Sequence, residues 1–154
     1  MNLEKCKADF QNKYYEIIRS IYFSPRVQCK GEKNIKLKFD FSYRIISIDE
    51  VELKNDDNKG YLGALEFTVK SYLESNPKKA VLEVTVFGLF DGIGMERDSF
   101  KAMLELNGLT FLSQIMRTHI LMATGGTGNK QIALPMINVT RIIEEHHSKE
   151  SEVE

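Results

Sequence analysis

A strict alternation of apolar and polar side chains between residues 35 and 44 constrains the fold more than any other feature of this chain. Five apolar side chains in this stretch are separated by charged or hydroxyl-bearing ones: Ile35, Leu37, Phe39, Phe41 and Tyr43. Because successive side chains of a β-strand point to opposite faces of the sheet, this period of two predicts a strand with one face buried and one in water. Such half-buried strands are typical of antiparallel sheets, so we expect an antiparallel sheet with one covered face.

Three other segments have the composition or the alternation of strands, at residues 17–23, 65–70 and 80–90. Isoleucine, tyrosine and phenylalanine dominate the first segment, which Pro25 ends or bends because proline cannot donate a hydrogen bond to a strand ladder. A loop rich in Asn, Asp and Gly at 54–60 separates the alternating strand from the segment at 65–70. The sequence therefore predicts four strands in succession.

The last of these strands has an irregularity at Gly88. Three apolar residues alternate regularly before it, and three more surround it without alternation: Leu82, Val84 and Val86, then Phe87, Leu89 and Phe90. A glycine inside a strand commonly marks a bulge or a close approach of another segment to the backbone. We expect a bulge at Gly88 that turns at least one of Phe87 and Leu89 away from the sheet core.

Apolar residues at gaps of three and four predict helices at residues 3–15, 98–106 and 110–123. Four strands followed by helices predict an α+β fold. Its elements are a four-stranded antiparallel sheet, two C-terminal helices packed on one side, and an N-terminal amphipathic helix. At 154 residues the chain is long enough for one domain, expected over residues 3–143. Residues 144–154 are polar and acidic at their end, which predicts a flexible tail, disordered past about His147.

Composition and charge exclude several classes of protein. A net charge of −1 gives no basic patch for nucleic acid. No apolar run approaches the roughly 20 residues that span a bilayer, and the first residues lack the apolar core of a signal peptide. Cys6 and Cys29 are expected to be free thiols in a reducing compartment. The expected location is the cytoplasm, without membrane insertion.

Several groups that could carry chemistry fit structural roles better. The glycine loop at 125–130 follows a helix and has its lysine after Asn129, so it matches a helix C-cap rather than a phosphate-binding loop. His146 and His147 lie in the expected tail, where a metal site would be weak and adventitious, and His119 lies within a helix. We therefore expect no enzyme, no cofactor and no metal site.

Apolar side chains are more numerous than one sheet and two short helices need for a core. Soluble monomers rarely expose wide apolar patches, so the surplus indicates a subunit interface or a binding groove. Flexible methionines also suit surfaces that accept varied partners. We expect one apolar strip that binds polypeptide segments: Phe41, Tyr43, Phe87, Leu89, Leu134, Met136 and Ile137.

The order of these motifs resembles the SecB family of export chaperones over about residues 19–140. The specific part is the strand end at 88–90, the Gly-Gly loop at 125–128 and the apolar segment at 134–139. Arg117 stands in the place of an arginine in that family's long helix. Residues 19–22 are similar to the start of its first strand.

This resemblance implies an ATP-independent holdase for unfolded polypeptides. SecB-like proteins are homotetramers, built as dimers of dimers with helices between the dimers. They hold unfolded preproteins in long apolar grooves and pass them to the SecA motor for export. The acidic residues that contact SecA lie on the exposed sheet face, and only Glu83 keeps a carboxylate in this chain.

The departures from the family point to other clients. SecB is usually strongly acidic, whereas this chain is nearly neutral, and Pro25 and Cys29 stand at two positions of the SecA contact. An antitoxin from a toxin–antitoxin system would fit these departures. The competing interpretation is a non-chaperone SecB-fold protein that binds one folded partner. A broad preference for unfolded segments would favour the chaperone, and a single tight partner would favour the alternative.

Overall fold

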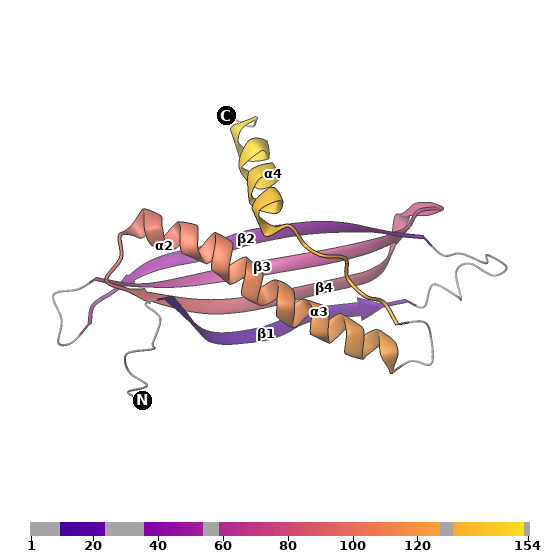
Figure 1. Ribbon diagram of the computed structural model, residues 1–154, viewed down its shortest axis with the longest axis horizontal. Coiled ribbons are helices and arrows are strands. Elements are labelled where there is room, and N and C mark those ends of the chain that lie inside the picture. The colour runs from indigo at the N-terminus through magenta and orange to yellow at the C-terminus, as the bar shows by residue number, and fades with distance from the viewer. Residues whose placement is uncertain (1–9, 24–35, 54–58, 127–130, 153–154) are drawn as a thin grey trace.

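The computed structural model describes residues 10–23, 36–53, 59–126 and 131–152. Four long strands form one sheet in the order β1-β4-β3-β2, and every neighbouring pair is antiparallel (Figure 1). The strands are β1 (Phe10–Tyr22), β2 (Leu37–Val51), β3 (Gly60–Leu73) and β4 (Asn76–Ile93). The predicted antiparallel sheet is therefore confirmed, with β1 and β2 as its two edges.

The helices gather on one face of this sheet. Helix α2 (Arg97–Met103), a π-helical turn (η2, Leu104–Gly108) and α3 (Leu109–Gly125) follow one another without interruption and cross the sheet as one rod (Figure 1). The sequence predicted two helices separated at Asn107-Gly108, but the backbone of Gly108 is helical, with φ −62° and ψ −49°. A β-carbon at Gly108 would lie 3.0 Å from Leu65, so this glycine allows the rod to approach β3. No helix among the described residues is long and apolar enough to cross a membrane.

The core lies between the helical rod and the sheet. Its fully buried side chains come from the facing surfaces of both layers: Leu65, Phe67, Val84, Val86 and Phe90 from the strands, and Phe100, Leu104, Leu112, Met116 and Ile120 from the helices. Burial of these side chains, each contributing about 1.5–3 kcal/mol relative to an exposed position, stabilises the two-layer arrangement. The opposite face of the sheet, called the open face below, carries no helix among the described residues.

The prediction of a bulge at Gly88 is wrong. The β3–β4 register runs without a shift from Lys70 opposite Glu83 to Gly60 opposite Ile93. Regular alternation alone puts Phe90 on the covered face, and Phe87 and Leu89 on the open face. The presence of glycine at position 88 has a different explanation. A β-carbon there would lie 2.9 Å from Leu112 of α3, so a larger residue would crowd the helix.

The N-terminal helix expected over residues 3–15 is wrong where the structure describes it. Residues 10–15 belong to β1, and residues 3–9 lie outside the described part of the chain. Two register irregularities in β1, between Asn12 and Tyr14 and between Ile17 and Arg19, break the period of two. The resulting uneven spacing of the apolar residues resembled a helical period.

Residues 139–151 form a fourth helical element, α4, where the sequence predicted a flexible tail from residue 144. The Asn138 side chain caps the helix by accepting a hydrogen bond from the Arg141 backbone N–H at 3.1 Å. Arg141 pairs with Glu145 one turn later at 2.9 Å. Three partly buried residues attach its first turns to the core: Val139, Ile142 and Ile143.

Candidate functional site

The strand register divides the predicted apolar strip between the two faces of the sheet. Tyr43 lies opposite Phe67, and Phe67 lies opposite Val86, so the β2 aromatics belong to the covered face. Phe87 lies opposite Glu66 and Leu89 opposite Ala64, which places both on the open face. The expectation that Phe41 and Tyr43 continue one strip with Phe87 and Leu89 is therefore wrong. It depended on the bulge that the structure does not have.

The covered side of β2 carries an aromatic row, called here the β2 strip: Phe39, Phe41 and Tyr43. Phe41 stacks between Phe39, at a centroid distance of 6.5 Å, and Phe67, at 6.3 Å. Phe39 and Phe41 are only partly buried, whereas Tyr43 is 6% exposed. The strip thus packs on the core at Phe67, while Phe39 and Phe41 stay partly accessible on the edge strand.

The segment between α3 and α4 runs beside the helical rod and is held to it by polar contacts. Gln131 donates to the carbonyl of Leu121 at 2.9 Å, and Arg117 donates to the carbonyl of Pro135 at 2.9 Å. Thr124 Oγ1 accepts from the backbone N–H of Ile132 at 2.9 Å.

The segment's apolar side chains divide between the core and the surface. Leu134 is buried and Ile137 is partly buried against the core, so neither is a free wall of a groove. Met136 points outward and is 92% exposed. It is the most exposed of the predicted site residues.

A cleft of about 340 Å³ lies between β2, α2 and α4. Tyr43 and Ile45 form part of its apolar wall, and Arg97, Lys101 and Glu105 add charge at the side of the helical rod. Tyr43 donates its hydroxyl hydrogen to Glu105 Oε1 at 3.0 Å. Burial, and next the bond to Glu105, raise the pKa of Tyr43, which keeps the hydroxyl protonated as a donor.

Two histidines of α4 contact residues that line the cleft. The ring of His146 stacks on Tyr43 at a centroid distance of 4.3 Å, and His147 Nε2 lies 2.9 Å from Glu105 Oε1. Glu105 was not predicted from the sequence, and both histidines were expected in a flexible tail. The helix cap at Asn138 was the one local signal that could have indicated an ordered helix there.

The open face carries ion pairs around Phe87. Glu83 is 2.9 Å from Arg19 and 4.0 Å from Lys70, and its side chain is 21% exposed. Arg44 pairs with Glu66 at 2.8 Å beside Phe87. The carboxylate of Glu83 is thus shared between two cations of the same sheet, and it is not a free acidic contact.

The comparisons with known proteins identify the fold. No family model and no curated protein matches the sequence. Among solved structures, the chain is similar to the SecB-like chaperone Rv1957 of Mycobacterium tuberculosis, in complex with a ChAD peptide from the HigA1 antitoxin. The TM-score is 0.50 at 13% identity, over 84% of this chain and 91% of that chain. A protein of unknown function from Streptococcus agalactiae matches with a TM-score of 0.42 at 9% identity, over 82% and 97% of the two chains. The similarity to Rv1957 shows that the chain has a SecB-like fold.

Proposed function

We propose that this chain is an ATP-independent holdase chaperone that binds non-native polypeptide segments in the cytosol. The observation that carries the proposal is the β2 strip, in which Phe39 and Phe41 are partly exposed on an edge strand. Met136, on the segment that leads to α4, is a further exposed apolar side chain. Stacked phenylalanines offer a large apolar area that is already ordered, so binding costs little side-chain entropy.

An extended client segment suits this surface. Among the described strands β2 pairs only with β3, so its outer edge offers unpaired backbone groups to a second chain. Alternate client side chains would then lie on Phe39 and Phe41. Each apolar contact contributes about 25 cal/mol per Å² of buried apolar area, independent of the client's sequence. A holdase needs to accept clients of different sequence in this way.

An antitoxin segment is the client class that we favour over an export preprotein. The neighbour of known function holds a peptide from an antitoxin, which supports the fold's capacity for such a ligand. An export role through a SecA-like motor would need an acidic contact surface. Glu83, the candidate for that contact, is bound by Arg19 and Lys70, which argues for the antitoxin client.

The test measures suppression of aggregation without ATP. A chemically unfolded polypeptide is diluted into buffer with and without the protein, and light scattering reports aggregation. Replacing Met136 with Ser should weaken client affinity severalfold, on the order of 1 kcal/mol, because a thioether side chain leaves the surface. The melting temperature should not change, since Met136 is 92% exposed.

The matched control is Ile93→Ser at the end of β4. Ile93 is 40% exposed and pairs with Gly60, whereas the β2 strip starts opposite Ser71 at the other end of β3. This variant should keep full activity. Equal loss in both variants would show that the loss is not specific to Met136 and would argue against a client contact there. A protein that protects no unrelated unfolded client, yet binds one folded partner tightly, would favour the non-chaperone alternative.

A further inference from the structure

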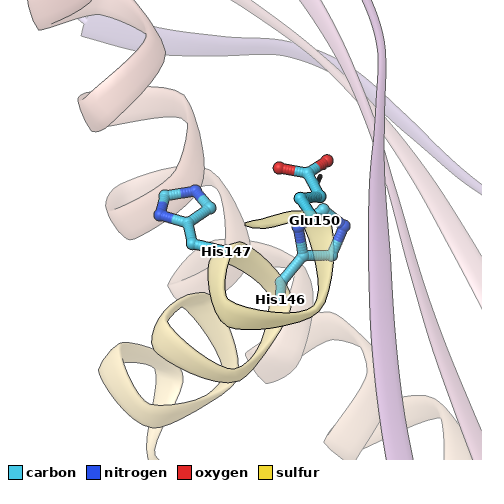
Figure 2. Close-up of side chains that lie close together, drawn as sticks. All are labelled: His146, His147 and Glu150. Carbon is cyan, nitrogen blue, oxygen red and sulfur yellow. Dashed lines mark ion pairs between the residues drawn. The ribbon is translucent and has the colours of Figure 1, made fainter. Parts of the chain in front are cut away.

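Three potential metal ligands meet on α4. His146, His147 and Glu150 each offer one ligand atom, and the three atoms lie within 4.8 Å of one another. Glu150 lies four residues after His146 and three after His147, so it can approach both, although the two adjacent histidines do not share one side of the helix. Figure 2 shows His146 and Glu150 next to each other, with the dashed ion pair between them, and His147 on the adjoining side of the same helix.

The ring of His146 is held in place with one nitrogen unused. Stacking on Tyr43 fixes the ring plane, at the centroid distance of 4.3 Å. Its Nδ1 is buried, has no hydrogen-bond partner and lies 3.7 Å from Glu150 Oε1. A buried polar atom without a partner costs free energy, and coordination of an ion would satisfy such an atom.

Glu105 positions His147 in the way that carboxylates position metal-binding histidines. Glu105 is 7% exposed, and its Oε1 accepts from Tyr43 and lies 2.9 Å from His147 Nε2. With Nε2–H donating to this carboxylate, the lone pair of the imidazole is on Nδ1. Such an outer carboxylate fixes the tautomer and the ring orientation, and makes the other nitrogen a better ligand.

We propose that His146, His147 and Glu150 bind a divalent transition-metal ion of the zinc type. Two imidazole nitrogens and one carboxylate oxygen, with water as a fourth ligand, match the tetrahedral preference of Zn²⁺. Tetrahedral coordination requires ligand atoms about 3.4 Å from one another. The distances between the three ligand atoms, now up to 4.8 Å, would therefore have to shorten by roughly an ångström. The Glu150 side chain is 66% exposed and can make that movement. This proposal does not depend on the chaperone function.

The bound ion would hold α4 against the sheet. His146 contacts β2 through Tyr43, and His147 contacts the helical rod through Glu105, so an ion that joins them fixes both contacts at once. Binding of the ion would therefore control whether α4 stays in place over the cleft between β2 and α2. Hard cations such as Mg²⁺ and Ca²⁺ prefer sites made wholly of oxygen ligands and should not bind here.

The experiment uses the full chain with Cys6→Ser and Cys29→Ser, because thiolates bind Zn²⁺ independently. Calorimetric titration with zinc chloride after removal of metal should show one ion per chain, and magnesium chloride should show none. Glu150→Gln and His146→Phe should each weaken Zn²⁺ binding at least about tenfold. His146→Phe keeps a ring to stack on Tyr43, and Glu150 is exposed, so both variants should fold.

Glu145→Gln is the matched control on the same helix. Glu145 pairs with Arg141 and is not one of the three ligands, so its replacement should leave Zn²⁺ affinity unchanged. Glu105→Gln should weaken binding about 10- to 100-fold while the tetrahedral Co²⁺ absorption spectrum keeps its form, as expected for a positioning residue. The proposal is overturned if no saturable binding occurs, or if Glu150→Gln and Glu145→Gln behave alike.

Discussion

His119 is a single titratable residue that couples stability to pH. It lies on α3, where its Nε2 is 2.8 Å from Ser20 Oγ of β1, and it is partly buried between the two elements. Burial lowers the pKa of His119, because the charged imidazolium loses hydration. The unfolded chain, with a histidine pKa near about 6.5, therefore binds a proton at this residue before the folded chain does.

We predict that acidification destabilises the protein through this residue. The free energy of unfolding should fall as pH drops through about 6.5, until the folded form also takes up the proton. Urea denaturation at pH 7.5 and pH 5.5 should show a smaller difference for His119→Gln than for the parent. The other two histidines are present in both proteins and cancel in the comparison. An unchanged pH dependence in the variant would contradict the prediction.

At the residue scale, the sequence predicted side-chain type better than side-chain direction. Phe41 and Tyr43 lie on the covered face because their strand alternates regularly, and the local pattern contains that information. Phe87 and Leu89 were expected on the same strip because a bulge was predicted at Gly88, but β4 alternates regularly there and places both on the open face. Glu105 was missed because its importance comes from Tyr43 and His147, which are far away in the chain.

The packing of the helical rod on the sheet depends on glycines in β3 and β4. Gly63, Gly88 and Gly92 lie on the covered face, where a β-carbon at each would come within 2.9 Å of a buried side chain. At Gly63 and Gly92 the nearest helical side chains are Phe100 and Leu104, both fully buried. The three glycines lack side chains and so form a track on the covered face, along which the helices can approach the sheet closely.

We predict that Gly88→Ala destabilises the protein by about 1–3 kcal/mol, because overpacking forces core side chains from their positions. The new β-carbon would lie 2.7 Å from Phe90 and 2.9 Å from Leu112, and both of these side chains are fully buried in the core. Gly60→Ala is the control, since its nearest neighbour would be 3.4 Å away. Urea denaturation measures both, and equal stability of the two variants would show that the track tolerates side chains.

At the element scale, regular strands were predictable and irregular elements were not. β2, β3 and β4 appear in the sequence as alternation, although each is longer in the structure than the pattern indicated. β1 was mistaken for a helix over residues 10–15 because its two irregularities hide the alternation. α4 has few apolar residues of its own, so its order depends on the cap at Asn138 and on contacts to the core.

Across the whole molecule, one group of exposed apolar side chains lies at the β1 side, and others lie on the helices at Leu106 and Leu121. The helix residues Phe100, Leu104 and Ile120 are fully buried against the sheet, so they are not available to a second subunit. The exposed or partly buried apolar side chains of the β1 side lie on β1 and on the flank of α3 beside it: Tyr15, Ile18, Phe111, Ile115 and Met122. Tyr15 meets Phe111 edge to face at 5.8 Å, which joins the two elements into one surface. Among the described strands β1 pairs only with β4, so this surface adjoins an unpaired strand edge.

We predict that the chain forms an oligomer through this β1 surface, with a tetramer as the expected size. Free lysines on an edge strand oppose edge-to-edge pairing, but the cations of β1, Lys13 and Arg19, are each bound at 2.9 Å by a carboxylate of β4. Replacing Ile18 with Lys should therefore shift the protein toward the 17.7 kDa monomer in light scattering. Ile46→Lys is a close control, because both isoleucines are exposed (47% and 43%) and both lie at a register irregularity on an edge strand. If Ile46→Lys dissociates the oligomer and Ile18→Lys does not, β2 is the contact edge, and the client surface proposed there would be occupied by a second subunit.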